Sequence, residues 1–179
     1  LGRGNLRRVP IDGNRRMDPD ALRDLVRSDL AAGLVPVAVV ATGGTTITGA
    51  VDPLDAVADV CAELGVWMHV DGAYGLPAAS STTAGALFTG LSRADSASVD
   101  AHKWMFVPKA CSVLMVRDQE SLTRAFRHDA SYMVEEEGFR HPVDGTLEYS
   151  RPFRSLKLWT ALRAHGADAF RDAIERNLL

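Results

Sequence analysis

The sequence lacks the features that mark several classes of protein. Two cysteines, Cys61 and Cys111, cannot form a disulfide scaffold for 179 residues, so we expect a reducing, cytoplasmic setting. No apolar run reaches the roughly 18 residues that a membrane span requires. The 20 basic residues do not outnumber the 23 acidic ones, and a formal charge of −3 argues against nucleic-acid binding. The five histidines follow no zinc-binding spacing, so we expect no metal.

Lysine is also scarce. Only three of the 20 basic residues are lysines, namely Lys103, Lys109 and Lys157. Any chemistry that needs the primary amine of a side chain therefore has three candidates. The remaining composition, 46% hydrophobic and 24% charged, is typical of a folded globular protein.

Helical and strand-like segments alternate along the chain, which predicts βαβ units and an α/β fold with a mainly parallel sheet. Two helices should begin at Asp18-Pro19 and Asp52-Pro53, because Asp is a favoured N-cap and proline is favoured in the first turn. Gly33 and Gly65 should end these helices. A third, amphipathic helix is expected near the C-terminus, with its apolar face formed by Leu156, Trp159, Leu162, Phe170, Ile174 and Leu178.

Four short apolar runs predict the strands, at residues 37–41, 66–70, 94–99 and 111–116. The first run is β-branched, which is typical of a parallel strand buried on both faces of its sheet. The last strand should be antiparallel or at an edge. Residues 127–150 show no clear period and predict a long loop.

The polar residues that follow the first three strands should meet in space. In an open α/β sheet, ligands bind beyond the carboxyl ends of the strands. The turn at residues 42–46, Asp71 and the pair His102-Lys103 all fall there. Asp71 and Lys103 are 32 residues apart, about one βαβ unit, so we expect them on neighbouring strand ends that face one crevice.

A carboxylate and a lysine that share a crevice have a specific use in enzymes that carry pyridoxal phosphate. The lysine amine bonds to the cofactor aldehyde, and the carboxylate pairs with the protonated pyridine nitrogen. The alternative is an ordinary ion pair between Asp71 and Lys103. The apolar residues 104–106 after the lysine favour the first interpretation, because they predict an apolar surrounding for the amine.

Four segments of the sequence carry recognisable motifs. Residues 69–75 read HVDGAYG, and residues 98–104 read SVDAHKW. Residues 39–46 read VVATGGTT and precede a GxxDP pattern, and residues 151–159 read RPFRSLKLW. These segments resemble motifs of the group II pyridoxal-phosphate-dependent amino acid decarboxylases, which include aromatic amino acid, glutamate and cysteine sulfinate decarboxylases. The four segments follow one another along this chain in the same order as the motifs do in the family. Gly72 departs from the family's HVDAAYG, and we expect this smaller residue to be tolerated.

The resemblance implies pyridoxal 5'-phosphate as the cofactor and gives four residues a role around its ring. Lys103 would bond to the cofactor, and Asp71 would pair with the pyridine nitrogen. Ala73 would lie against the ring, where a small side chain lets the cofactor approach. Thr42 would line the pocket near Asp71.

Two further residues, Asp100 and His102, would flank the lysine on the phosphate side. A carboxylate beside a phosphate needs a hydrogen-bond donor to be tolerated, so Asp100 should bond to a hydroxyl or to the imidazole. The alternative for His102 is a packed surface histidine.

Tyr132 occupies the place where the family carries a loop tyrosine that protonates the substrate carbon after carbon dioxide leaves. Relatives that act as aldehyde synthases tend to have phenylalanine there, so Tyr132 favours simple decarboxylation. The alternative is an aromatic side chain that only packs within the loop. Because this loop tends to reach the partner's site in the family, the resemblance implies a homodimer with its active site near the interface.

The resemblance also implies a domain plan of fold type I pyridoxal-phosphate enzymes. Residues 1–154 would form part of the cofactor-binding large domain, and residues 155–179 a helix that leads to a small domain outside this sequence. Family members are much longer and the chain starts at Leu1, so we expect a longer polypeptide. The family segments that stack a histidine on the cofactor and supply most phosphate contacts have no counterpart in these 179 residues.

The function expected on this basis is decarboxylation of an L-amino acid to an amine and carbon dioxide by the full-length protein. Two alternatives stay open. Another fold type I enzyme, such as a carbon–carbon lyase or an aminotransferase, would share Asp71 and Lys103 but not the Tyr132 loop. A fragment or degenerate copy would bind the cofactor poorly, because half a pocket holds the phosphate badly and an unpaired sheet exposes its edges.

Overall fold

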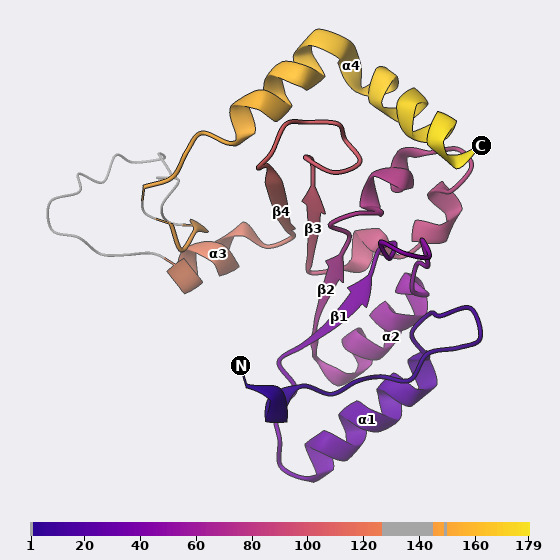
Figure 1. Cartoon of the computed structure of the whole chain (residues 1–179). Helices are drawn as coiled ribbons and strands as arrows, with labels where there is room; N and C mark the ends of the chain where they lie inside the picture. The colour runs from indigo at the N-terminus through magenta and orange to yellow at the C-terminus, as the bar shows by residue number, and fades with distance from the viewer. Residues whose placement is uncertain (1, 127–144, 149) are drawn as a thin grey trace, which may run out of the picture.

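The computed structural model describes residues 2–126, 145–148 and 150–179, and in these residues it contains one sheet of four strands. The strands lie side by side in chain order as β1 (Ala38–Thr42), β2 (Trp67–Asp71), β3 (Ser96–Asp100) and β4 (Ser112–Val116) (Figure 1). Strands β1, β2 and β3 are parallel, and β4 pairs antiparallel with β3. This confirms the predicted mainly parallel sheet with an antiparallel last strand.

Helices connect and cover these strands. The α-helices are α1 (Pro19–Ala31), α2 (Leu54–Leu64), α3 (Gln119–Phe126) and α4 (Ser155–Leu178). Short 3-10 helices are also present: η1 (Arg3–Asn5) precedes α1, and η2 (Leu76–Ser80), η3 (Gly85–Phe88) and η4 (Leu91–Arg93) lie between β2 and β3. None of the helices in the described residues is long and apolar enough to cross a bilayer.

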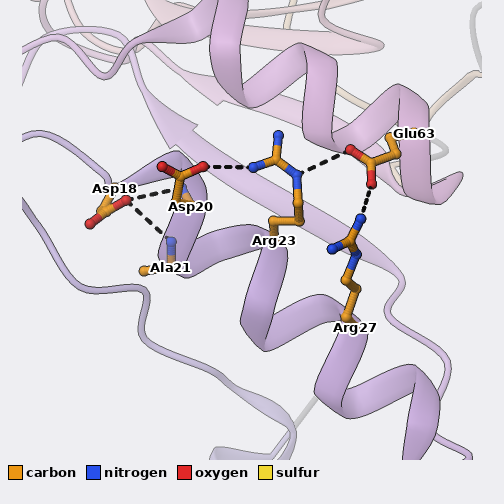
Figure 2. A network of polar contacts seen from close by, with 6 residues as sticks. All are labelled: Asp18, Asp20, Ala21, Arg23, Arg27 and Glu63. Atoms are coloured by element: carbon orange, nitrogen blue, oxygen red, sulfur yellow. Dashed lines mark hydrogen bonds and ion pairs between the residues drawn. The ribbon is translucent and has the colours of Figure 1, made fainter.

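Helix α1 begins where the sequence predicts and is tied to α2 by charged side chains. Asp18 Oδ1 accepts hydrogen bonds from the backbone N–H groups of residues 20 and 21, as an N-cap does. Arg23 Nε and Arg27 Nη2 donate to the two carboxylate oxygens of Glu63 on α2, at 3.1 and 2.6 Å (Figure 2). These two arginines lower the pKa of Glu63. Because the groups are exposed, they orient the two helices more than they stabilise the fold.

The main core lies between these helices and one face of the sheet. In Figure 1, α1 and α2 lie together on one side of β1 and β2. Val39 and Ala41 of β1 are buried on that face, whereas Val40, which points the other way, is 56% exposed. The prediction that this strand is buried on both faces is therefore wrong within the described residues, because no described helix covers its second face.

Helix α4 consists of two parts that meet at Gly166, whose positive φ of 77° interrupts the helical backbone. The first part packs Leu158 and Ala161 against a small apolar cluster, and the second part buries Ile174 to 2% exposure in the main core. Leu156 and Trp159, which were predicted on the apolar face, are 47% and 61% exposed. That prediction is wrong for both residues within the described structure, because this part of the helix packs through Leu158 and Ala161 instead.

Glu175 anchors the second part of α4 to the loop between η2 and η3. Its carboxylate accepts hydrogen bonds from the hydroxyls of Ser81, Thr82 and Thr83 and from the backbone N–H of Thr83. The bonds from Ser81 and Thr83 contribute most, and together they lower the pKa of Glu175 to about 2. The charged carboxylate is therefore the form that the folded chain prefers.

This anchor predicts a pH-dependent stability difference between the parent and a Glu175→Gln variant. The folded pKa of about 2 lies below the ordinary value of 4.5, so the extra stability is present above pH 4.5 and is lost as the pH falls toward 2. Thermal unfolding should show a lower midpoint for the variant near neutral pH, and a difference that narrows below pH 4.5.

The matched control is Asp168→Asn on the same helix, whose carboxylate is exposed and, within the described part of the chain, paired only with Arg171. We expect this change to leave the midpoint nearly unaltered at every pH. Equal midpoints for the parent and Glu175→Gln at neutral pH would contradict the anchoring role.

Candidate active site

The sheet places three polar side chains in one row across its parallel strands. Thr42 pairs in register with Asp71, and Asp71 pairs in register with Ser98. Register partners on adjacent strands point to the same face of a sheet. All three stand at or near the carboxyl ends of β1, β2 and β3, on the face that α1 and α2 leave uncovered. This is where the sequence predicted a ligand crevice.

Thr42 is held by a buried carboxylate from the next motif. Asp52 is 6% exposed, and its Oδ2 accepts a hydrogen bond of 2.7 Å from the Thr42 backbone N–H. Its Oδ1 accepts a bond of 2.7 Å from the backbone N–H of Met17. Helix α2 itself begins one residue after Pro53, without a side-chain cap. Asp52 thus fixes the end of β1 instead of capping the helix.

The loops after β1 and β2 touch backbone to backbone at Gly44 and Gly75. A Cβ added to Gly44 would lie 2.7 Å from the Gly75 Cα, and Gly44 also has a positive φ of 98°. Only glycine permits both the close approach and this backbone conformation. The contact keeps the loop that follows Thr42 against the loop that follows Asp71.

Asp71 has one oxygen engaged and one available. Its Oδ1 accepts a hydrogen bond from the Ala73 N–H at 3.1 Å and a long one from the Ser98 hydroxyl at 3.5 Å. Its Oδ2 has no hydrogen-bond partner within the described residues, and the side chain is exposed. The carboxylate is thus oriented by two donors and can accept one more proton donor.

The turn after β3 brings Lys103 to the same face as Asp71. Asp100 is two residues beyond Ser98 on β3, so the two side chains share a face. Lys103 Nζ lies 2.8 Å from Asp100 Oδ2, and the Ser112 hydroxyl donates to Asp100 Oδ1. The Asp100 N–H donates to the Ala73 carbonyl at 3.1 Å, which joins the segment after Asp71 to the segment before Lys103.

The electrostatics of Asp100 follow from these contacts. Partial burial alone would raise its pKa, but hydrogen bonds from Lys103 and Ser112 outweigh burial and lower the pKa. The predicted hydroxyl donor to this carboxylate is therefore present. The prediction of an apolar surrounding for the Lys103 amine is wrong, because the side chain is 37% exposed and the amine is paired with a carboxylate.

His102 lies beside the lysine and is bonded to the main chain of Cys111. Its Nδ1 is 3.0 Å from the Cys111 carbonyl oxygen and 3.2 Å from the Cys111 nitrogen, and the ring is half-buried. This contact fixes the ring close to Lys103, and its part in cofactor binding stays a prediction. Tyr132 lies outside the described residues, so its predicted role is not tested by the structure.

These residues fit a pyridoxal phosphate ring. The oriented Asp71 carboxylate offers a free oxygen to a protonated ring nitrogen, and the small side chain of Ala73 follows it. Lys103 offers a primary amine on the same face. Among the described residues, no cluster of three or more His, Cys, Asp or Glu side chains could hold a metal ion.

Comparison with known proteins leads to the same class. The family model described as the pyridoxal-dependent decarboxylase conserved domain matches residues 2–178. The chain belongs to this family. It is 36% identical over 176 residues to an aromatic-L-amino-acid decarboxylase of Bacillus atrophaeus, and 36% identical over 181 residues to a cysteine sulfinic acid decarboxylase of Rattus norvegicus. These alignments cover 96% and 98% of this chain and 37% of each relative.

The solved structures of this decarboxylase family share the fold. The crystal structure of Oryza sativa TDC with PLP and tryptamine superposes with a TM-score of 0.90 at 34% identity, covering 96% of this chain and 36% of that one. The chain therefore has the α/β architecture of fold type I enzymes, and it spans little more than a third of the length of the relatives that it matches.

Sequence reasoning missed several residues that shape the site. Ser98 orients Asp71, Ser112 supports Asp100, and Asp52 holds Thr42. The period-2 pattern of a strand could have paired Ser98 with Asp100 on one face. Ser112 and Asp52 contact their partners through strand register and loop packing, for which the sequence carries no local signal.

Gly72 is another position where the structure changes the interpretation. A Cβ added to Gly72 would lie 2.3 Å from the Leu76 Cβ, far inside van der Waals contact. Leu76 is itself buried at 6% exposure, and its Cβ cannot move without its backbone. Glycine is therefore required by the leucine four residues later, and is not merely tolerated in place of the family's alanine.

We predict that Gly72→Ala destabilises this protein although it restores the family motif. Overpacking of this kind lowers the unfolding free energy by about 1–3 kcal/mol. Denaturant unfolding of the variant measures the loss, with Gly13→Ala as the control, because a Cβ at Gly13 meets nothing within 4 Å. A Gly72→Ala variant as stable as the Gly13→Ala variant would refute the steric argument.

Proposed function

We propose that the protein that contains this chain decarboxylates an amino acid with pyridoxal phosphate as its cofactor. The observation that carries the proposal is the placement of Asp71 and Lys103 on one uncovered sheet face, linked through Asp100 and Ala73. The names of the relatives support the reaction class, since they include aromatic-L-amino-acid and cysteine sulfinic acid decarboxylases. They do not favour a carbon–carbon lyase or an aminotransferase.

Each residue of the site then has a task. When bound, pyridoxal phosphate supplies an aldehyde for amines and a ring that withdraws electrons from the substrate carbon. Asp71, oriented by Ser98 and by the Ala73 N–H, holds a proton at the ring nitrogen. Lys103 would hold the group through its primary amine. Asp100 and Ser112 keep the amine of Lys103 on the correct face of the sheet.

The finer features of the proposal rest on the family resemblance. We propose that Tyr132 gives a proton to the substrate carbon, and that the protein is a homodimer whose active site lies near the interface. The division into a large-domain part at residues 1–154 and a linking helix at residues 155–179 is part of the same proposal. Helix α4, which begins at Ser155, supports that boundary. The cytoplasmic location stays a prediction, and Cys61 and Cys111 are both free thiols.

The three lysines allow a direct test of the cofactor site in the full-length protein. Incubation with pyridoxal phosphate, reduction with borohydride and mass spectrometry should locate the pyridoxyl group on Lys103 and not on Lys109 or Lys157. A Lys103→Arg variant keeps a cation beside Asp100 but offers no amine that can bond to the aldehyde, so the adduct should be lost.

The matched control for this test is Lys109→Arg, which should keep the adduct and the activity. An adduct that persists unchanged in Lys103→Arg would overturn the assignment of the lysine. Release of carbon dioxide from amino acids, measured on the same samples, tests the reaction class, while formation of a keto acid would favour an aminotransferase.

The proposed role of Tyr132 gives a second test. Replacement by phenylalanine removes the phenolic proton, and loss of a positioned general acid lowers rates by about 100-fold or more. We expect Tyr132→Phe to slow amine formation by at least that factor while the affinity for pyridoxal phosphate stays at the parental level. Amine release and a cofactor titration measure the two quantities, and an unchanged rate would show that Tyr132 only packs.

A further inference from the structure

The turn that carries Lys103 is packed against helix α4. Three buried side chains of this turn, Ala101, Val107 and Cys111, form a small cluster with residues 158 and 161 of the helix. Near the same place, Lys157 Nζ donates a hydrogen bond of 2.8 Å to the Lys109 carbonyl. Figure 1 shows α4 crossing beyond β3 and β4 on its way to the C-terminus. The helix therefore forms one side of the environment of the lysine turn.

The residue after the lysine makes a second, directional contact with α4. Trp104 Nε1 donates a hydrogen bond of 2.9 Å to Asn177 Oδ1, close to the C-terminal end of the helix. This distance is normal for an N–H···O bond. Asn177 in turn lies two residues beyond Glu175, whose carboxylate fixes this part of α4 to residues 81–83. The acceptor of the indole proton is thus on an anchored helix.

The same indole ring touches the loop that carries the other half of the site. Trp104 and Tyr74 stack with ring centroids 5.6 Å apart and planes inclined by 14°. Tyr74 is three residues after Asp71, and Trp104 is one residue after Lys103. One side chain therefore connects the segment of the carboxylate, the segment of the amine and helix α4.

We propose that Asn177 and Trp104 are positioning residues that set Lys103 relative to Asp71. This inference rests on the proposed function of those two residues. A cofactor ring has a fixed distance between its nitrogen and its aldehyde, so the amine and the carboxylate must match that distance together. Stacking on Tyr74 restrains the plane of the indole, and the bond to Asn177 fixes its rotation within that plane. Without the bond, Asp71 can still pair with the ring nitrogen while the amine reaches the aldehyde less often.

The test uses the full-length protein and three variants. Trp104→Phe keeps an aromatic ring for Tyr74 but has no N–H, and Asn177→Leu keeps the size of the side chain but has no acceptor. The third variant combines both. The readouts are the affinity for pyridoxal phosphate and the fraction of bound cofactor that borohydride traps on Lys103. A merely structural role would lower the thermal midpoint without changing that fraction.

We expect each single variant to lower the trapped fraction and to weaken cofactor affinity by about 2- to 10-fold, as loss of one hydrogen bond does. The double variant should lose no more than the stronger single variant, because both changes remove the same bond. Asn177→Asp retains an acceptor oxygen and should restore the trapped fraction. Trp159→Phe and Arg176→Ala serve as controls, because both residues are exposed and form no hydrogen bond or ion pair with the lysine turn in the described structure.

Three outcomes would overturn the inference, and the last is distinguishable from the first two. A parent adduct on Lys103 with an unchanged trapped fraction in both single variants would overturn the positioning role alone. Losses that multiply in the double variant would do the same, since they would show two independent effects. A parent that forms no adduct on Lys103 would overturn the proposed function and the positioning role with it.

Discussion

The register between the parallel strands is the constraint on which the site depends. It sets Thr42, Asp71 and Ser98 in one row, and a shift of one residue in β2 would turn Asp71 toward the core under α2. The core residues of the same strands resist such a shift, because Met68 and Val70 alternate with the polar positions and are fully buried. The packing of one face therefore fixes the chemistry of the other.

A second constraint is that the site is assembled from loops that approach one another more closely than ordinary side chains permit. Gly44 meets Gly75 through its backbone, and Gly72 leaves space for Leu76. The first contact holds the loop after Asp71 against the loop after β1, and the second lets Leu76 pack into the core beside the motif. They also make the site sensitive to the small residues around it, and not only to the residues that carry charge.

The sequence predicted the elements better than it predicted their surroundings. The N-cap of α1 at Asp18 and the end of α2 at Gly65 depend on local backbone preferences, which single residues reveal. The exposure of Val40 depends on which segments cover the second face of the sheet, and no local pattern contains that information.

The site was predictable to a similar degree. Strand ends and spacing were enough to predict that Asp71 and the turn of Lys103 lie at the same end of the sheet, because parallel strands end on the same side of a sheet. The ion pair of Lys103 with Asp100 could not be read from the apolar residues that follow the lysine, since a turn reverses the chain at that point. The steric need for Gly72 could not be read from the motif either, because it arises from a folded contact: η2 brings Leu76 back over Gly72.

The contacts of α4 illustrate why apolar packing alone does not complete such a site. Hydrophobic burial is not directional, so the cluster around Ala101 and Cys111 fixes the distance of the lysine turn from α4 but not the orientation of its side chains. Hydrogen bonds are directional, and here two polar residues near the end of the helix, Glu175 and Asn177, accept them. The two kinds of contact are complementary: burial of Ile174 brings the helix to the core, and the polar bonds determine how the loops beside Lys103 and Asp71 are held against it.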